Sequence, residues 1–223
     1  MNKNFTYNSI GSGIYTIPDI AHILNLPIGK VSRWMREYWG SEIGRKNNHS
    51  YYNGEGKDRT TNFNTLIEFY VFYQLRELKI GSKKIFEAHN KIAKTTGSLY
   101  PFANSEILAN PKNIFYAIDE DRAIDTKTDQ ITYKELIKDF CRKIEFSEDK
   151  VAARFYPAGK DKFIVVDPKH QFGQPIIIGT NVLAENIFSM YESGEDEVRI
   201  GKLFDLTLRE VKDAISFYKM KAA

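Results

Sequence analysis

Residues 16–38 read TIPDIAHILNLPIGKVSRWMREY, and this stretch decides the fold that the sequence predicts. Thr16 is suited to cap a helix, with Pro18 in the first turn and Asp19 as the capping-box partner. The segment Asn25-Leu26-Pro27 then interrupts the helical pattern. Apolar residues return after it at helical spacing, at Val31, Trp34, Met35 and Tyr38. The stretch therefore predicts two short helices joined by a tight turn, a helix-turn-helix whose second helix covers residues 28–38.

Outward from this unit, the sequence predicts helices separated by short strands. Residues 1–14 show no periodic pattern and suggest a short flexible arm, whereas the turn-rich residues 40–61 favour a β-hairpin or long loop, a wing. Helical patterns follow at 63–79, 82–95, 132–143, 183–192, 195–204 and 208–219, and strand patterns at 113–118, 122–126, 162–166 and 175–178. The expected fold class is mainly α with short β-hairpins. The expected domains are an N-terminal winged helix-turn-helix domain (1–103), a small α/β connector (104–158) and a C-terminal three-helix domain (159–223).

The C-terminal end repeats the N-terminal pattern at an offset of 180 residues. Ala21 corresponds to Gly201, and Asn25 corresponds to Asp205. A small residue lets the two helices cross closely, and Asn and Asp tolerate the left-handed backbone that a tight turn requires. The chain is therefore expected to contain a second helix-turn-helix, and a capping box at residues 207–210 is expected to open its last helix.

The charge of the chain is uneven, although its 223 residues have a net charge of only +3. Residues 1–100 contain 14 Lys and Arg against 8 Asp and Glu, and residues 101–223 contain 18 against 21. A balance of +6 in one part and −3 in the other is typical of a protein that binds a polyanion at one end and a protein at the other. Ordinary variation of surface charge is the alternative explanation.

The helix predicted at residues 28–38 offers polar residues for DNA recognition. Arg can bond guanine through two hydrogen bonds, whereas Lys and Ser suit phosphates. The predicted DNA-binding residues are Lys30, Ser32, Arg33, Arg36, Arg45, Lys46, Asn48, Lys57 and Arg59. A possible second DNA or dimer contact consists of Arg209, Lys212 and Ser216, which follow the acidic run 195–197. Acidic groups repel phosphate, so the N-terminal unit is expected to bind DNA and the C-terminal unit to bind protein.

The sequence gives no positive case for an enzyme. The histidines His22, His49, His89 and His170 have no metal-ligand spacing, and Asp119, Glu120, Asp121 and Asp125 suit a hairpin turn better than a metal site. No cofactor or metal is expected. The single cysteine, Cys141, fits a reducing cytoplasm, and no apolar run is long enough to span a membrane.

Several motifs carry a resemblance to a known family. Residues 15–40, continued by residues 62–69 and Gly81, resemble a MerR-type helix-turn-helix. Residues 154–218 resemble the C-terminal domain of VapB-like antitoxins, a small helical domain long catalogued as of unknown function. The matching runs are RFYP (154–157), VVDP (165–168), FGQP (172–175), IGT (178–180), ESG (192–194) and the final pair of helices. Members often have Arg after Gly-Thr, where this chain has Asn181.

The resemblance implies a type II antitoxin that binds double-stranded promoter DNA, neutralises a cognate toxin, commonly a PIN-like ribonuclease, and forms a homodimer. Some members consist of the C-terminal domain alone, which leaves open which helix-turn-helix binds DNA. One alternative is a MerR-like regulator that responds to a small ligand, without a toxin, and that has a pocket within residues 100–150. Another is an adaptor that buries both helix-turn-helix units in protein interfaces.

Overall fold

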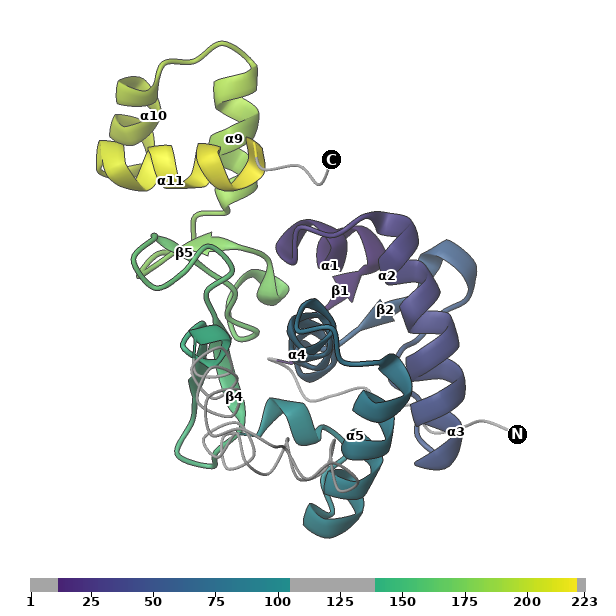
Figure 1. The fold of residues 1–223 in the computed structure, drawn as a ribbon. Helices are drawn as coiled ribbons and strands as arrows, with labels where there is room; N and C mark the ends of the chain where they lie inside the picture. Colours follow the sequence, from purple (N-terminus) through teal and green to yellow (C-terminus); the bar gives the residue numbers. More distant parts are fainter. Residues whose placement is uncertain (1–11, 105–138, 220–223) are drawn as a thin grey trace. The chain divides into compact units, whose positions relative to one another are not determined.

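The computed structural model describes residues 12–104 and 139–219, and its ribbon is shown in Figure 1. The described residues form two compact units. Unit 1 contains residues 33–53 and the described residues between 64 and 153, and unit 2 contains residues 12–32, 54–63 and 154–219. The chain is mainly helical with short antiparallel strand pairs, as the sequence predicts. The strands predicted at 113–118 and 122–126, the acidic run 119–121 and most of the helix at 132–143 lie outside the described residues.

Unit 1 is built around two long helices, α4 (Phe63–Glu77) and α5 (Ser82–Thr96). A continuous helical run precedes them, formed by α2 (Ile28–Trp34), the π-helix η1 (Met35–Ile43) and α3 (Gly44–Lys46). Residues 28–32 of this run belong to unit 2. The short 3-10 helix η3 (Pro101–Ala103) follows α5, and β3 (Ile144–Phe146) pairs with β4 (Ala152–Phe155).

Aromatic side chains fill the core of unit 1. Trp39 stacks on Phe69 with ring centroids 4.0 Å apart, and Phe72 stacks on Phe86 at 5.1 Å. In the same core, His89 Nε2 lies 2.8 Å from Glu68 Oε2, with both side chains fully buried. The other Glu68 oxygen accepts a hydrogen bond of 2.8 Å from the Phe102 backbone N–H. A buried carboxylate is costly unless it is paired and hydrogen-bonded, so these contacts fix the packing of α4, α5 and η3.

The predicted helix end at Tyr38 is wrong, because the helical run continues to Lys46. A π-helix bonds each residue to the one five positions along, and here the Gly44 N–H donates to the Trp39 carbonyl. This winding keeps residues at four-residue spacing on the buried side, and Met35, Trp39 and Ile43 are each at most 1% exposed. Residues 40–46 of the expected wing are therefore helical. The later part contains a 3-10 turn, η2 (Gly56–Asp58), and the strand β2 (Thr60–Thr61).

Unit 2 combines the first elements of the chain with its last ones. β1 (Tyr15–Thr16) pairs with β2, and α1 (Ile17–Ile23) follows β1. Further along, β5 (Ile164–Val165) pairs antiparallel with β6 (Ile176–Ile177), which places Ile164 opposite Ile177. Three helices complete the unit: α9 (Ala184–Glu192), α10 (Glu197–Phe204) and α11 (Leu208–Lys219). Their shared core consists of Ile164, Ile177, Ala184, Ile187, Ile200, Val211, Ala214, Ile215 and Phe217.

The two predicted turns have the same backbone geometry. Asn25 has a φ of 50° and Asp205 a φ of 54°, so both turn residues are left-handed. After each of them, a leucine N–H donates a 2.8 Å hydrogen bond, from Leu26 to the Ala21 carbonyl and from Leu206 to the Gly201 carbonyl. Both capping boxes also form, at Thr16 with Asp19 and at Thr207 with Glu210. The left-handed turns at the two equivalent positions are confirmed, as are both predicted capping boxes, although Thr16 and Thr207 are not equivalent at this offset.

The arm that was expected to be flexible is held in place over residues 12–14. The Phe63 N–H donates to the Ser12 carbonyl at 2.9 Å, and the Ile14 N–H donates to the Phe172 carbonyl at 2.8 Å. The phenol of the fully buried Tyr15 packs against Gly173. The loop at residues 170–174 therefore contacts the segment that leads into α1.

Candidate nucleic-acid interface and a pocket

The first predicted DNA-binding residues lie directly after the turn at Asn25. Lys30, Ser32 and Arg33 are on α2, where Arg33 is exposed and the other two are partly exposed. Arg36 is the second residue of η1, with 62% of its side chain exposed and its Nη2 3.2 Å from Glu37 Oε1. An exposed pair of this kind contributes little to stability, so it does not prevent the Arg36 guanidinium from contacting a ligand.

The remaining predicted DNA-binding residues lie on three later segments. Arg45 and Lys46 are exposed on α3, where the Lys46 Nζ is 3.7 Å from Glu42 Oε2, and Asn48 follows with a φ of 48°. Lys57 is exposed on η2, whereas Arg59 is half-buried and donates a 3.0 Å hydrogen bond to the Gly56 carbonyl. Unit 1 contains Arg33, Arg36, Arg45, Lys46 and Asn48, and unit 2 contains Lys30, Ser32, Lys57 and Arg59.

The second predicted group lies on α11 and has close neighbours within unit 2. Arg209 donates to the Asp161 carbonyl at 3.2 Å, and its guanidinium lies 5.2 Å from the Phe163 ring centre. The Lys212 Nζ is 3.7 Å from Glu197 Oε2, and Ser216 is exposed. The acidic partner of Lys212 reduces the positive field on α11, so this helix is less suited to phosphate than α2.

Two side chains that could take part in catalysis or metal binding, Cys141 and His22, are packed within the fold. Burial raises the pKa of the Cys141 thiol to about 12, which keeps it protonated and unreactive at neutral pH. His22 stacks on Tyr218 with ring centroids 4.2 Å apart and meets the edge of Phe217 at 5.0 Å. Residues 12–104 and 139–219 contain no group of three or more His, Cys, Asp or Glu side chains that could hold a metal ion. Within the same ranges, no helix has the length and hydropathy to cross a membrane.

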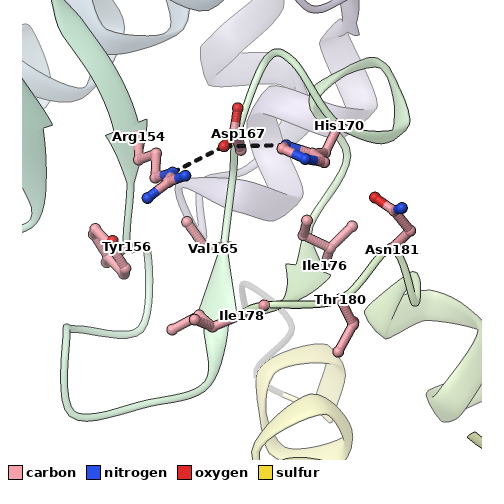
Figure 2. A pocket seen from close by; sticks show the side chains of 10 residues that line it. Arg154, Tyr156, Val165, Asp167, His170, Ile176, Ile178, Thr180 and Asn181 are labelled. Carbon is pink, nitrogen blue, oxygen red and sulfur yellow. Dashed lines mark hydrogen bonds and ion pairs between the residues drawn. The ribbon is translucent and has the colours of Figure 1, made fainter. Parts of the chain in front are cut away.

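Unit 2 also contains a pocket of about 330 Å³ that the sequence did not reveal, and we call it the Arg154 pocket (Figure 2). It is lined by Arg154, Tyr156, Val165, Asp167, His170, Ile176, Ile178, Gly179, Thr180 and Asn181. These residues come from β4, β5, β6 and the loops after them, and Arg154 and Asp167 lie 13 positions apart. Several of the motifs quoted above line this pocket, but the spacing of those motifs does not show that they converge.

An ion pair organises the polar side of the Arg154 pocket, as the dashed lines in Figure 2 indicate. The Asp167 side chain is 6% exposed, and its Oδ2 lies 2.8 Å from Arg154 Nε and 3.2 Å from His170 Nδ1. Its Oδ1 accepts a 2.9 Å hydrogen bond from the Lys169 N–H. Burial opposes ionisation of Asp167, but the bonds from Arg154 and Lys169, with His170 nearby, hold its pKa below the ordinary value. The carboxylate is therefore ionised at neutral pH.

Comparison with known proteins matches part of unit 2 to a family model. Residues 164–218 match the model of a family described as a protein of unknown function, DUF433. A curated relative is named "Putative antitoxin VapB45", from Mycobacterium tuberculosis (strain ATCC 25618 / H37Rv). It is 23% identical over 90 residues, which are 40% of this chain and 38% of that protein. The match therefore spans less than half of either chain.

A solved structure resembles a larger part of the chain. It is the X-ray crystal structure of Rv2018 from Mycobacterium tuberculosis, with a TM-score of 0.71 and 17% sequence identity. The similarity covers 90% of this chain and 96% of that one, and at this identity it concerns the fold. Together these comparisons support the expected similarity to an antitoxin-like family. The MerR-like character of the N-terminal part stays a prediction.

Proposed function

We propose that this chain is the DNA-binding antitoxin of a type II toxin–antitoxin pair, acting in the cytoplasm. It binds a cognate toxin, a PIN-like ribonuclease, and represses its own operon. The observation on which the proposal depends most is the similarity of residues 164–218 to DUF433, together with a relative named as an antitoxin. In this proposed function the chain itself catalyses no reaction.

The N-terminal helix-turn-helix is the DNA reader in this proposal. The left-handed turn at Asn25 sets α2 at an angle to α1, and the exposed Arg33 and Arg36 follow on the same helical run. Arg33 and Arg36 read guanine edges in the major groove, whereas Lys46 and Lys57 contact phosphate and position the protein. The wing of the MerR-like domain is the segment that follows α3.

The C-terminal domain, residues 159–223, forms the protein contacts in this proposal. Its helices α10 and α11 expose the apolar side chains Val198, Leu203 and Leu208 to 50%, 63% and 46%. Exposed apolar side chains favour a protein partner over the phosphate backbone. The toxin or the second copy of a homodimer is the partner.

The toxin assignment is tested by co-expression with the product of the neighbouring open reading frame. We expect the neighbouring product to co-purify with this chain as a stable complex that has no ribonuclease activity. The same product prepared without the chain must have ribonuclease activity. If the neighbouring product neither binds the chain nor has nuclease activity, the antitoxin assignment is wrong and a ligand-responsive regulator becomes the better hypothesis.

The DNA assignment is tested by gel shifts on the promoter at controlled salt. Arg33→Ala combined with Arg36→Ala should weaken specific binding by about 1–3 kcal/mol per lost guanine contact and relax sequence preference. Lys46→Ala should weaken all sequences alike and reduce the salt slope by about one. The control, Lys83→Ala combined with Lys94→Ala, removes two exposed charges from α5. Equal loss in the control and the arginine variant would contradict the assignment.

A further inference from the structure

We propose that Phe172 is the anchor by which this chain binds its toxin, and that it fits an apolar pocket bordered by carboxylates on the toxin. The contact surface, which we call the Phe172 surface, consists of Ile14, Lys169 and Phe172 in unit 2. The inference rests on the proposed function, because that function names a toxin as the partner. It goes further by placing the central contact outside α10 and α11.

Phe172 is the most exposed of the large apolar side chains in residues 12–104 and 139–219. It is 74% exposed, and Ile14 is 53% exposed. The two residues are neighbours in space, since the Ile14 N–H donates to the Phe172 carbonyl at 2.8 Å. Apolar groups exposed together at one point of a surface favour a partner that removes them from water.

The backbone that presents the phenyl ring is strained. Phe172 is the middle residue of the short 3-10 helix η4 (Gln171–Gly173), and its φ of 55° and ψ of 20° are left-handed. Gln171 and Gly173 are also left-handed, with φ of 46° and 85°. Glycine and asparagine adopt this conformation readily, whereas a bulky side chain does so at a cost. Phe172 is therefore unfavourable both in its backbone and in its exposure, and such strain concentrates at functional sites.

Hydrogen bonds hold the loop in this conformation. The Gly173 N–H donates to the His170 carbonyl at 2.8 Å, and Gln171 Nε2 donates to the Asn181 carbonyl at 3.0 Å. An aromatic ring on a fixed backbone loses little conformational freedom when it binds. The loop is therefore preorganised to present Phe172 to a partner.

The charge beside the phenyl ring is positive. Residues 12–14 and 168–175 contain no Asp or Glu, and Lys169 among them is exposed. Two carboxylates of the same unit, Asp19 and Asp167, already accept hydrogen bonds from backbone N–H groups. Carboxylates around the partner's pocket would complement this charge.

A toxin fits this surface better than DNA or a second copy of the chain. An apolar side chain can wedge between base pairs, but cations must then hold the phosphates on either side. Lys169 is the only Lys or Arg in residues 12–14 and 168–175, and these segments contain none of the predicted DNA-binding residues. In a two-fold dimer built on this surface, the same positive segment would face itself.

The test measures the affinity of the full chain for the product of the neighbouring open reading frame, together with thermal unfolding of the free chain. Phe172→Asn should weaken binding by about 30-fold, the usual loss when a central aromatic anchor is removed. It should leave the midpoint of unfolding unchanged or raise it by about 1–4 °C, because asparagine tolerates the left-handed backbone. Leu99→Asn is the matched control in unit 1, since it removes an apolar side chain that is 40% exposed. It should leave the affinity unchanged.

A second pair of variants tests the charge. Lys169→Glu should slow association with the toxin by about threefold to tenfold and reduce the salt dependence of the association rate. Lys83→Glu makes the same change on α5, at a side chain that is 90% exposed, and should alter neither quantity. Equal effects of the two variants would contradict the assignment of a carboxylate-bordered pocket.

The outcomes separate this inference from the proposed function. If the neighbouring product does not bind the unaltered chain, the proposed function is wrong and the inference is wrong with it. If the product binds the unaltered chain and Phe172→Asn equally well, the inference alone is wrong. A lowered midpoint in Phe172→Asn would show that the ring packs within the fold, and this also overturns the inference. Loss of promoter binding in this variant would assign the ring to DNA, and loss of self-association would assign it to a second copy.

Discussion

Gly173 has a left-handed backbone, with a φ of 85°, and lies against the phenol of the buried Tyr15. An added methyl group at this position would overlap the phenol, which the surrounding core prevents from moving. Gly179 has a similar φ of 78° but no atom within 4 Å of such a methyl group. Substitution of Gly179 by alanine therefore tests the cost of backbone strain alone. Substitution of Gly173 tests that cost together with the cost of steric overlap.

We expect Gly179→Ala to lower the free energy of unfolding by about 1–2 kcal/mol, the ordinary cost of a left-handed non-glycine residue. Gly173→Ala should lower it by about 1–3 kcal/mol more, because it also overpacks a filled site. Urea unfolding of both variants measures the difference. Equal losses would show that residues 170–174 do not pack on Tyr15 in solution.

The lowered pKa of Asp167 leads to a prediction about the free energy of unfolding at acid pH. Its folded pKa is lowered, so its contribution to stability is present above the unfolded pKa of about 4 and is lost as pH falls through the folded value. Asp167→Asn should lower the free energy of unfolding at neutral pH and flatten its fall at acid pH. The measurement is unfolding as a function of pH, with the exposed Asp149→Asn as control. An unchanged acid profile in Asp167→Asn would contradict this account.

At the scale of elements, the π-helix η1 requires a small residue where it ends. An added methyl group on Gly44 would lie 2.5 Å from the Trp39 carbonyl oxygen and 3.0 Å from the His49 carbonyl oxygen. Both oxygens belong to the backbone, so they cannot move aside cheaply. Gly29 on α2 has no atom within 4 Å of such a group, although it also belongs to the helical run.

Gly44→Ala should therefore lower the free energy of unfolding by about 1–3 kcal/mol, the usual cost of overpacking. Gly29→Ala should leave it unchanged or raise it by up to about 1 kcal/mol, because alanine favours a helix more than glycine does. Thermal and urea unfolding report both changes. If Gly44→Ala is as stable as Gly29→Ala, η1 does not have the π geometry in solution.

At the scale of the whole molecule, a homodimer that binds DNA requires a two-fold DNA site. Its half-sites should lie about one helical turn apart, near 10 base pairs, or a multiple of that distance. Inserting about five base pairs between them should rotate one half-site to the opposite face of the duplex and abolish cooperative binding. Gel shifts and sedimentation on the two duplexes test this. Binding that is indifferent to the insertion would argue for a monomeric reader.

The sequence by itself determined the helices and the two turns. Capping boxes, the interrupting Asn25 and Asp205, and apolar residues at helical spacing are local signals, because each depends on residues a few positions apart. They predicted α1, α4, α5 and the three last helices within a few residues. They also predicted which arginines on α2 and η1 are exposed.

Only the tertiary structure decided where the helical run ends and where the pocket lies. Trp39 and Ile43 keep the chain helical beyond Tyr38 because they are buried in an aromatic core, and burial outweighs the turn propensity of the glycines around them. The Arg154 pocket forms from residues on separate strands and loops, and Ile14 meets Phe172 although 158 positions separate them in the numbering. Local spacing contains no information on such contacts, since they arise only when distant segments pack together.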